Sequence, residues 1–481
     1  MKQPASALFT DFYELTMAQG YWKRKMDEPA VFDMFFRRQP YDGGFSVFAG
    51  LGTLFDSLEG FVFREDDLVY LESLGIFESS FLDYLRSFRF SGDLYAIDEG
   101  SLVFPGEPLA RLHANLIEAQ VVEGLILNHL NFQSLIATKT ARIWLASRRG
   151  RIMEFGLRRA QGPDGALSAS RAAFIGGAGG TSNTLAGQVY GIPVQGTMAH
   201  SWIMSFPSEL EAFRAYAALY PDKSVFLIDT YDTLKSGIVN AITAGRELVE
   251  KGHGFGVRLD SGDLQYLSAQ VRRALDEAGM PQAGITVSND LTEEIIDTLV
   301  SNGAPITNWG VGTQLVTGGR ESSFTGVYKL AARWNSGEFV PVMKFSDNPE
   351  KTTNPGIKNL WRLFDENGMA QADILALNGE VIETGKTLRV FHPAADYRQL
   401  QITPTRVEEL LKKRLEGGKR LGPPASPREE ISAARTRMEV QLDTLDPSYK
   451  RLLNPHVYKV SLTQKLKDMK LTFIESRYSQ S

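Results

Sequence analysis

From about residue 150 to residue 335, the sequence alternates short apolar runs with polar or glycine-rich breaks and amphipathic segments. The apolar runs are RIMEF (151–155), IPVQG (192–196), SVFLI (224–228), FGVRL (255–259), GITVS (284–288) and PITNW (305–309). The breaks lead into segments with helical spacing, such as LQYLSAQVRRALDEAG (264–279). Strands that alternate with helices predict βαβ units and a parallel sheet. About seven such units in succession favour a closed or nearly closed (β/α) barrel over an open sheet.

Polar residues and glycines follow the ends of these runs. They are Arg158, His200, Asp229, Asp232, Asp260, Asp263, Asn289, Asp290, Gly310, Gly312 and Thr313. In a barrel, the carboxyl ends of all strands open on one rim, where active sites are built. The same residue types also begin helices and turns, and Asp290 with Glu293 is compatible with a capping box. The pattern therefore predicts a site at this rim, with capping as the alternative at each single position.

Composition excludes several classes of chemistry. The chain has no cysteine, which excludes disulfides, thiolate nucleophiles, iron–sulfur clusters and cysteine-ligated zinc. A net charge of −5 argues against a broad nucleic-acid-binding surface. The first residues, MKQPASALFTDFYELTMAQ, lack the apolar core of a signal peptide, and no apolar run reaches the length of a membrane span. We expect a cytoplasmic enzyme or binding protein without a nucleic-acid or membrane partner.

Two glycine-containing breaks favour phosphate binding. GVGT (310–313) follows a strand, and GGAGGTSN (176–183) precedes a helical segment; both can offer backbone N–H groups without side-chain obstruction. Neither has the pattern of a Walker loop or a dinucleotide-binding fingerprint. His200 stands in GTMAHSWIMSF (196–206), where a buried, hydrogen-bonded histidine is the alternative to a catalytic one.

Several longer motifs occur in one order along the chain. They are TDFYELTMAQGYW (10–22), EFGLRRAQGPDGA (154–166), GTMAHS (196–201), LIDTYDT (227–233), GVRLDSGDL (256–264), WGVGTQL (309–315), GVYKL (326–330) and KFSDNPEKTTNPG (344–356). In order and approximate spacing, these motifs resemble the nicotinate phosphoribosyltransferase family from about residue 8 to residue 360. The last hundred or so residues resemble it more loosely.

The resemblance implies a type II phosphoribosyltransferase fold. In that fold an irregular (β/α) barrel of about seven to eight strands packs against an N-terminal α/β domain completed by later chain. We expect an N-terminal domain at 1–130 completed by 345–400, a barrel at 131–344 and a C-terminal helical extension at 401–481. Within that extension, RVEELLKKRLEGGKR (406–420) predicts a solvated helix. The resemblance also implies a homodimer whose active sites borrow residues from the partner.

The implied reaction joins nicotinate and 5-phosphoribosyl 1-diphosphate to give nicotinate mononucleotide and diphosphate, as in NAD biosynthesis by salvage. ATP hydrolysis is coupled to it through a phosphorylated histidine. By motif position, His200 is that histidine. The positions carried over to nicotinate are Tyr13, Arg158 and Thr197, and those carried over to the ribose and phosphates are Arg258, Asp260 and Gly310–Thr313.

The chemistry of the implied reaction agrees with these residue types. Nicotinate is a flat anion, so the Tyr13 ring can stack on it and Arg158 can pair with its carboxylate. Asp260 can favour the positive charge that develops on the ribose as diphosphate leaves. Mg²⁺ normally accompanies a diphosphate leaving group, and Asp229 and Asp260 are the candidate ligands. Asp229 can instead orient His200 by bonding its second ring nitrogen.

Three alternatives remain open. A nicotinamide-using relative would need a carboxylate to accept from the amide, whereas the GGTSN break offers Ser182 and Asn183 as substrate contacts. A quinolinate-using relative would need a denser basic cluster and no phosphorylatable histidine. A non-catalytic ligand-binding relative would need no phosphoryl acceptor, whereas Arg258, Asp260 and His200 are all present. Asn289 and Asp290, at a strand end, complete the candidate substrate contacts.

Overall fold

The chain divides into two compact units. The structure, a computed structural model, describes residues 6–346, 351–395, 397–423 and 425–478. The first unit is formed by Met1–Leu135 and Ser323–Ser481, and the second by Ile136–Ser322. The sequence placed the boundaries after residues 130 and 344 and set 401–481 apart; the structure groups that last segment with the N-terminal residues. Among the described residues, every helix is too short or too polar to cross a lipid bilayer.

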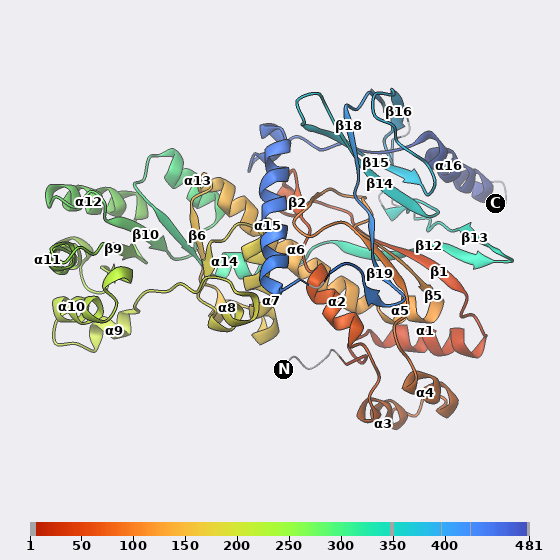
Figure 1. The fold of residues 1–481 in the computed structure, drawn as a ribbon, viewed down its shortest axis with the longest axis horizontal. Helices are drawn as coiled ribbons and strands as arrows, with labels where there is room; N and C mark the ends of the chain where they lie inside the picture. The colour runs from red at the N-terminus through yellow and green to blue at the C-terminus, as the bar shows by residue number, and fades with distance from the viewer. Residues whose placement is uncertain (1–5, 347–350, 396, 424, 479–481) are drawn as a thin grey trace. The chain divides into compact units, whose positions relative to one another are not determined.

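The second unit is built on a six-stranded parallel sheet (Figure 1). Its strands are β6 (Arg151–Glu154), β7 (Gly180–Thr181), β8 (Val225–Leu227), β9 (Gly256–Leu259), β10 (Gly284–Ser288) and β11 (Asn308–Val311). Their order is β7-β6-β11-β10-β9-β8. The strands bury both faces, as parallel strands covered by helices do; the successive residues Ile285 and Thr286 of β10, which point to opposite faces, are 0% and 2% exposed. This confirms the parallel α/β organisation expected from the sequence.

The order of the strands follows the chain around an incomplete ring. Strand β11 returns to pair with β6, and an isolated parallel bridge joins Thr181 to Val194 beyond β7. The predicted strand at 192–196 is thus reduced to this bridge. In the described part of the chain, β7 and β8 are the edge strands and no ladder joins them. The mixed α/β fold is confirmed, and closure into a barrel stays a prediction.

Helices follow the strands in this unit. They are α7 (Gly162–Ile175), α8 (Thr184–Tyr190), α9 (His200–Met204), α10 (Glu209–Leu219), α11 (Ile238–Val249), α12 (Leu264–Glu277), α13 (Glu293–Ser301) and α14 (Thr313–Val316). Two of the strand-end acids are caps: Asp263 accepts from the Tyr266 N–H at the start of α12, and Asp232 accepts from two N–H groups that follow it. The cap of α13 is Thr292, so the alternative of a capping box between Asp290 and Glu293 does not apply.

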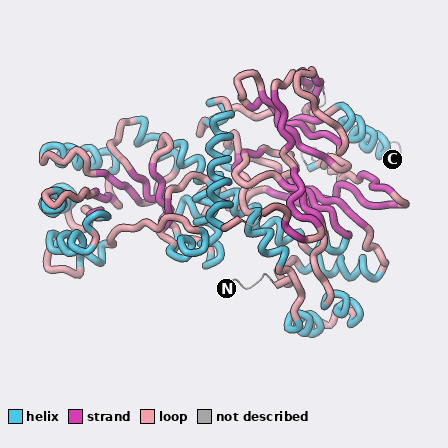
Figure 2. The backbone as a smooth tube through the Cα atoms, in the orientation of Figure 1, coloured by secondary structure: helices cyan, strands magenta, loops and turns pink. Residues whose placement is uncertain are grey.

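The first unit holds two larger sheets (Figure 2). One, in the order β13-β12-β1-β5-β3-β19-β20, is antiparallel throughout. Its strands are β1 (Pro29–Phe36), β3 (Asp93–Ala96), β5 (Ala110–Asn115), β12 (Gly326–Asn335), β13 (Glu338–Pro341), β19 (Lys412–Glu416) and β20 (Lys419–Arg420). The other has the order β17-β16-β21-β15-β14-β18. Its strands are β14 (Lys358–Phe364), β15 (Ala370–Leu377), β16 (Leu388–Phe391), β17 (Gln399–Ile402), β18 (Arg406–Glu409) and β21 (Val460–Leu462).

Helices and a two-stranded antiparallel sheet complete the first unit. Strands β2 (Ser46–Val47) and β4 (Leu102–Val103) pair with each other. The helices are α1 (Phe12–Lys23), α2 (Leu51–Glu59), α3 (Glu65–Ser73), α4 (Ser79–Arg86), α5 (Leu116–Val121), α15 (Pro427–Thr444) and α16 (Gln464–Tyr478), together with the first half of α6 (Glu123–Ala146), which continues into the second unit after Leu135. Apolar side chains of β1, β5 and the first helices form one core, in which the Phe32 and Tyr328 rings stack 4.7 Å apart. Burying each such side chain contributes roughly 1.5–3 kcal/mol.

The solvated helix predicted at 406–420 is wrong. This segment forms β18, which pairs with β14, and β19, which pairs with β3. The run of charged residues suits a helix surface, but Leu410, Leu411 and Leu415 are buried. Pairing partners far away in the sequence decided the structure of this segment.

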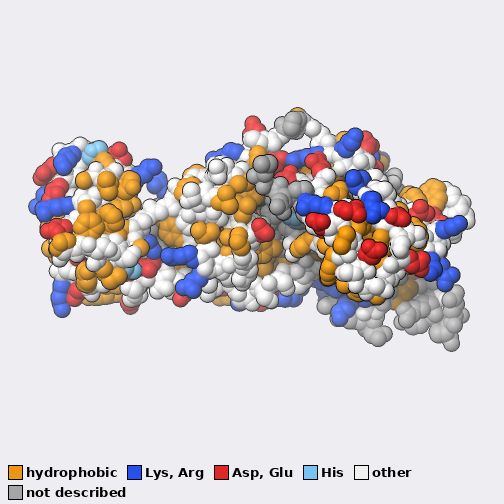
Figure 3. Space-filling view, turned by 90° about the horizontal axis from the view of Figure 1, so that it is seen from below, with side chains coloured by type: hydrophobic (Ala, Val, Ile, Leu, Met, Phe, Trp, Pro, Cys, Tyr) orange, Lys and Arg blue, Asp and Glu red, His pale blue; other side chains and the backbone are white. Residues whose placement is uncertain are grey.

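On the face drawn in Figure 3, acidic and basic side chains are interspersed.

Candidate active site

The carboxyl ends of β8, β9 and β10 bring together side chains from four of the sequence motifs. The backbone N–H of Asp260, just after β9, donates to Oδ2 of Asp229, just after β8, over 2.9 Å. The Ser261 hydroxyl donates to the same oxygen over 2.6 Å. The two strand ends are therefore tied directly, and the parallel pairing that places them side by side explains the convergence.

Arg258 is the centre of this cluster. Its guanidinium donates through Nε to the Ser288 hydroxyl over 2.9 Å, through Nη1 to the Thr197 hydroxyl over 2.9 Å and through Nη2 to Oδ1 of Asp260 over 2.7 Å. The same group lies over the Phe155 ring, 5.6 Å from its centroid. Three polar contacts and one aromatic face leave Arg258 a single orientation, which suits a fixed anion-binding group.

Asp260 is held in its ionised form. Burial by itself would raise the pKa of this carboxyl, but the Ser288 hydrogen bond and the charge of Arg258 outweigh it, with a smaller contribution from His200, so that the pKa lies below its ordinary value. Sequence reasoning missed Ser288, the last residue of β10. A small hydroxyl residue at a strand end was the available signal, but such residues also serve as ordinary turn formers.

His200 begins α9 and faces this cluster. Its Nδ1 lies 3.0 Å from the Thr230 hydroxyl, and its Nε2 lies 3.8 Å from Oδ2 of Asp260. The side chain is 39% exposed, so the imidazole is accessible rather than buried in a core. The alternative role of Asp229 as the ring partner is not observed, because the Thr230 hydroxyl lies at Nδ1. Thr230 lies in LIDTYDT, one position after Asp229.

Asp229 retains an unused acceptor. Its Oδ2 binds Asp260 and Ser261, whereas its Oδ1 is buried without a hydrogen-bond partner among the described residues. In the described part of the chain, no three His, Asp or Glu side chains converge as a protein-only metal cage would require. Mg²⁺ takes most of its ligands from water and substrate phosphates, with one or two carboxylates from the protein. The carboxylates of Asp229 and Asp260 therefore suit Mg²⁺ better than a structural metal whose ligands all come from the protein.

Glu154, at the end of β6, organises the loop that carries Arg158. It is 1% exposed, and its carboxylate accepts from the Gly156 N–H, the Ser170 hydroxyl and the Thr181 hydroxyl. The last two contacts tie α7 and β7 to the start of the loop. Sequence reasoning missed this residue because a lone acid inside an apolar run has no distinctive spacing.

Arg158 is exposed, in a short helical turn after β6, with no hydrogen bond or ion pair to another described residue. Its guanidinium is therefore free to meet an anion. Close packing fixes the start of this loop, because a Cβ on Gly156 would lie 2.2 Å from Cγ1 of Val316. Glycine is thus required there by space.

Other predicted residues divide between exposed and structural positions. Asn289 and Asp290 are exposed and adopt positive φ angles of 86° and 35°, a conformation that Asn and Asp tolerate. Asn183 is buried and caps α8 by accepting from the Ala186 N–H, while its amide group donates to Ser170. The side chain of Asn183 is thus committed to the fold, and its neighbour Ser182 is half-buried.

The GVGT segment is part strand and part turn. Gly310 lies within β11 rather than after it, so its prediction as a loop residue is wrong. A Cβ on Gly310 would lie 2.7 Å from the Phe155 ring, the ring over which Arg258 is stacked. Gly312 and Thr313 form the turn into α14. The absence of a side chain at Gly310 therefore leaves space for the Phe155 ring. The turn at Gly312 and Thr313 can offer backbone N–H groups to a ligand.

Three family models cover most of the chain. The nicotinate phosphoribosyltransferase N-terminal domain matches residues 8–131, the nicotinate phosphoribosyltransferase family matches 151–372, and the C-terminal domain matches 357–470. The chain belongs to the nicotinate phosphoribosyltransferase family. The nicotinate phosphoribosyltransferase of Bacillus subtilis is 41% identical over 96% of this chain and 94% of its own length. The human nicotinate phosphoribosyltransferase is 34% identical over 96% and 95%.

The fold agrees with family membership. The crystal structure of human nicotinic acid phosphoribosyltransferase superposes with a TM-score of 0.84 at 31% identity, covering 96% of this chain and 99% of that one. A nicotinate-nucleotide pyrophosphorylase from Pyrococcus furiosus shares the fold, with a TM-score of 0.70 at 21% identity, 91% of this chain and 96% of that one. The family resemblance drawn from the motifs is therefore confirmed.

In this member of the nicotinate phosphoribosyltransferase family, Tyr13 lies in the first unit, in the first turn of α1, and is 49% exposed. Burial of the rest of the ring, with the charges of Glu123, Glu14 and Asp11, raises the pKa of its hydroxyl to about 12. The phenol is therefore neutral at physiological pH. A neutral, half-exposed ring is suited to stacking on a flat ligand.

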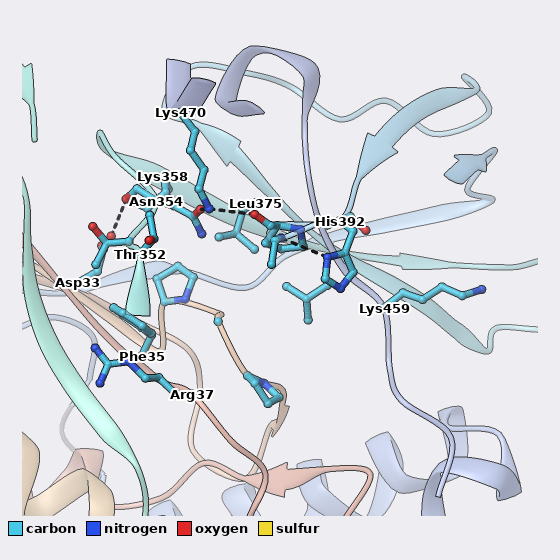
Figure 4. A pocket seen from close by; sticks show the side chains of 18 of the residues that line it. Asp33, Phe35, Arg37, Thr352, Asn354, Lys358, Leu375, His392, Lys459 and Lys470 are labelled. Carbon is cyan, nitrogen blue, oxygen red and sulfur yellow. Dashed lines mark hydrogen bonds and ion pairs between the residues drawn. The ribbon is translucent and has the colours of Figure 1, made fainter. Parts of the chain in front are cut away.

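The first unit also contains a cavity of about 750 Å³ that none of the predicted site residues lines (Figure 4). Lys470 closes one side, where its ammonium group donates to Oδ1 of Asn354 and to the Pro393 carbonyl, each over 2.9 Å. Lys358 pairs there with Asp33 over 2.7 Å. Burial and the charge of Lys358 lower the pKa of Lys470 to about 8. Two of the family motifs contribute to its lining: GVYKL (326–330) through Lys329 and Leu330, and KFSDNPEKTTNPG (344–356) through residues 352–354.

Proposed function

We propose that this chain transfers a 5-phosphoribosyl group from 5-phosphoribosyl 1-diphosphate to nicotinate, giving nicotinate mononucleotide and diphosphate, with ATP hydrolysed in the same cycle. The observation that carries the proposal is the contact set of Asp260, which binds Arg258 and faces His200. One carboxylate thus links an anion-binding arginine to an accessible imidazole. A binding protein has no need of the second group.

The nicotinate contacts proposed are Tyr13, Arg158 and Thr197. Arg158 is exposed and unpaired among the described residues, so pairing with the nicotinate carboxylate breaks no contact within the chain. The Thr197 hydroxyl accepts from Arg258 and donates to the Met198 carbonyl over 3.3 Å, a long bond that it can exchange for one to a ligand. Ser182 remains a candidate contact through its hydroxyl. The structural role of Asn183 argues for backbone rather than side-chain involvement there.

Arg258 and Asp260 act on the phosphoribosyl group. As the bond from the ribose to diphosphate breaks, positive charge grows on the sugar, and an ionised Asp260 stabilises that charge. The lowered pKa keeps this carboxyl ionised at neutral pH. Arg258, fixed by Ser288 and Phe155, attracts phosphate oxygens, and the Gly312–Thr313 turn offers N–H groups to them. Asn289 and Asp290, which are exposed just after β10, are the remaining substrate contacts that we propose.

His200 is the proposed phosphoryl acceptor. The negative charge of Asp260 on the Nε2 side favours a proton on Nε2, which leaves the lone pair on Nδ1. The Thr230 hydroxyl can donate to that lone pair until a phosphoryl group replaces it. A phosphoryl group adds roughly −1.5 to −2 charges, taking phosphoserine as the guide, beside the Arg258–Asp260 pair. That change can alter the affinity for phosphoribosyl diphosphate and so couple ATP to the cycle.

Asp229 and Asp260 are the proposed Mg²⁺ ligands. The buried, unpartnered Oδ1 of Asp229 fits such a cation, which would neutralise the charge of the leaving diphosphate. The family resemblance supports a homodimer with shared active sites and a barrel in the second unit. Both remain proposals, as do the ATP and Mg²⁺ requirements.

One assay tests the proposal. Initial rates are measured with nicotinate, nicotinamide or quinolinate, each with and without ATP, and the mononucleotide formed is quantified by chromatography. Nicotinate should be favoured over nicotinamide by roughly tenfold to a hundredfold, because a charge-assisted pair contributes about 1.5–3 kcal/mol. ATP should raise the rate with nicotinate. Equal use of the acid and the amide, or carbon dioxide release from quinolinate, would refute the assignment.

A further inference from the structure

Glu14, in the first turn of α1, is a carboxyl group in an unusual position. It is 0% exposed. Its Oε2 accepts from the Asp11 N–H over 3.2 Å and contacts the Thr10 hydroxyl, whereas its Oε1 is buried without a hydrogen-bond partner in the described chain. An ionised carboxylate with a buried, unpartnered oxygen is costly, so the site favours a neutral acid.

The contacts of Thr10 lead to the same conclusion. Its Oγ1 is in contact with Glu14 Oε2 and also lies 2.9 Å from the Val121 carbonyl at the end of α5. A carbonyl only accepts, and a hydroxyl has one proton to donate. Thr10 can donate its one proton to Glu14 or to Val121, and each contact has its own proton when Thr10 donates to Val121 and a protonated Glu14 donates to Thr10. The proton of Glu14 thus completes a link from α1 through Thr10 to α5.

The neighbouring charges oppose ionisation. Asp11 precedes Glu14 on the same turn, and Glu123 faces it from α6. Glu123 is itself bound to the Gln120 amide and lies 3.9 Å from the Lys329 ammonium, the one cation in an ion pair with this group of carboxyls among the described residues. Burial first, and then Glu123 and Asp11, raise the pKa of Glu14 from its ordinary 4.5 to about 7, against the lowering effect of Thr10.

The remaining ionisable groups around Glu14 are phenols. Tyr328, on β12, is buried and donates to the Ala119 carbonyl over 2.9 Å, so its proton is already used. Tyr13 is adjacent in the chain and half-exposed. Both hydroxyls have raised pKa values and stay neutral when Glu14 titrates. Burial also raises the pKa of Glu123, which its hydrogen bond from Gln120 and the charge of Lys329 oppose. Glu14, with its pKa raised to about 7, is the carboxyl of this cluster that contacts Thr10 and lies next to Tyr13.

We propose that Glu14 is a positioning residue whose proton holds the turn that presents Tyr13, so that nicotinate binding weakens when this proton is lost. The proposal rests on the function proposed above. Loss of the proton breaks the Thr10 link and places a negative charge one residue from Tyr13. An anionic ligand then meets both a less ordered ring and added repulsion. The effect acts through Tyr13, not on the reacting bond.

The test compares wild type with Glu14→Gln, whose amide keeps the shape and carries no titrating proton. The KM for nicotinate and kcat are measured from about pH 5.5 to about pH 8.5. The ratio of the wild-type KM for nicotinate to that of Glu14→Gln should rise roughly threefold or more from the lowest to the highest pH, while the kcat values of the two proteins stay similar. Because both proteins meet the same substrates, dividing the wild-type KM profile by that of Glu14→Gln cancels the pH dependence that comes from ionisation of the substrates. Parallel profiles would overturn the proposal.

Two further variants make the test specific. Glu123→Gln removes the nearest facing charge, so the wild-type inflection should move to lower pH. Thr10→Val removes the link at every pH, so the KM should already be raised at low pH, and the remaining rise with pH, which comes from the charge of Glu14 alone, should be smaller than in wild type. An unmoved inflection in the first variant, or a wild-type profile in the second, would count against the proton link.

A measurement without turnover separates this proposal from the proposed function. Because the pKa of Glu14 is raised on folding, the acid contributes stability that is present below about pH 4.5 and lost as the pH rises through about 7. The melting temperature of Glu14→Gln should therefore gain on that of wild type as the pH is raised. If the melting temperature shows this gain but the protein has no activity with nicotinate, the proposed function is refuted and the role of the Glu14 proton in the fold is not. A difference in melting temperature that does not change with pH would refute the proposed role of the Glu14 proton.

Discussion

The side chains of His200 and Asp260 face each other, with 3.8 Å between Nε2 of the imidazole and Oδ2 of the carboxylate. The other carboxylate oxygen accepts from Arg258 over 2.7 Å. A change of charge on the imidazole is therefore felt by a carboxylate that also holds the arginine proposed to bind phosphate. This arrangement gives a direct electrostatic route from phosphorylation of His200 to substrate affinity.

His200→Ala should abolish labelling of the protein by γ-labelled ATP and remove the stimulation by ATP. The label in wild type should be labile to acid and stable to base, as expected of a phosphoramidate. Slow ATP-independent synthesis can persist, because the contacts to ring and ribose survive. His253→Asn is the matched control, since His253 pairs with Asp222 at 2.7 Å on the surface. Labelling that survives in His200→Ala would assign the histidine to the scaffold.

Thr230→Val should slow labelling without abolishing it. The hydroxyl lies 3.0 Å from Nδ1 of His200, and its loss frees the ring to rotate while leaving the nucleophile intact. The rate of phosphoryl incorporation is followed by quenched-flow labelling. A rate equal to that of wild type would show that Thr230 does not orient the imidazole.

Asp260→Asn should lower kcat strongly and leave the KM for nicotinate nearly unchanged, because the carboxylate is proposed to act on the ribosyl transition state. The control is Asp263→Ala, three residues on, which removes the cap of α12. That variant should lose about 0.5–2 kcal/mol of unfolding free energy and keep its kcat. The same outcome for both variants, stability loss with unchanged kinetics, would reduce Asp260 to a structural role.

Asp260 should also make stability depend on pH on the acid side. Its pKa is lower in the folded chain than in the unfolded chain, so it contributes stability that is present above the unfolded value of about 3.9 and lost as the pH falls through the folded value. Urea unfolding of wild type and Asp260→Asn is compared at neutral pH and near pH 3.5. The gap between the two free energies should narrow in acid. A gap that widens would contradict the lowered pKa.

Arg158→Gln should raise the KM for nicotinate and spare ATP hydrolysis. Because the side chain is exposed and makes no contact with a described residue, the melting temperature should stay close to that of wild type. Arg159→Gln, at the next and equally exposed position, should keep the wild-type KM. A shared effect of both variants would point to general loss of positive charge rather than to one specific pair.

Gly156→Ala should cost about 1–3 kcal/mol of unfolding free energy, because the added Cβ would lie 2.2 Å from Cγ1 of Val316. Nicotinate binding should weaken with it, since the loop to Arg158 begins there. Val316→Ala in the same chain makes space and should recover part of both losses. Denaturant unfolding of the four chains of this double-mutant cycle measures the coupling. Additive effects would show that the two residues do not compete for space.

Much of the candidate site could be predicted from the sequence. Asp229, Arg258 and Asp260 stand after or within short apolar runs, and parallel pairing of β8, β9 and β10 brings these positions together. His200 follows a run that forms only an isolated bridge, so its motif, not strand pairing, identified it. The motifs around them carry the family resemblance, which the family models confirm. Gly310 and Asn183 were identified with equal reason, but they are a strand residue beside Phe155 and a helix cap.

What the sequence by itself determined is the alternation of strands and helices in the second unit and the residue types at the strand ends, because period and local propensity are encoded within a few residues of each position. Only the tertiary structure decided the partners of those residues. Thr230 rather than Asp229 holds the His200 ring, Ser288 connects Arg258 to Asp260, and residues 406–420 form strands rather than a helix. The physical reason is the same in each case: a hydrogen-bond or strand partner that is distant in the sequence is chosen by three-dimensional packing, which local spacing does not record.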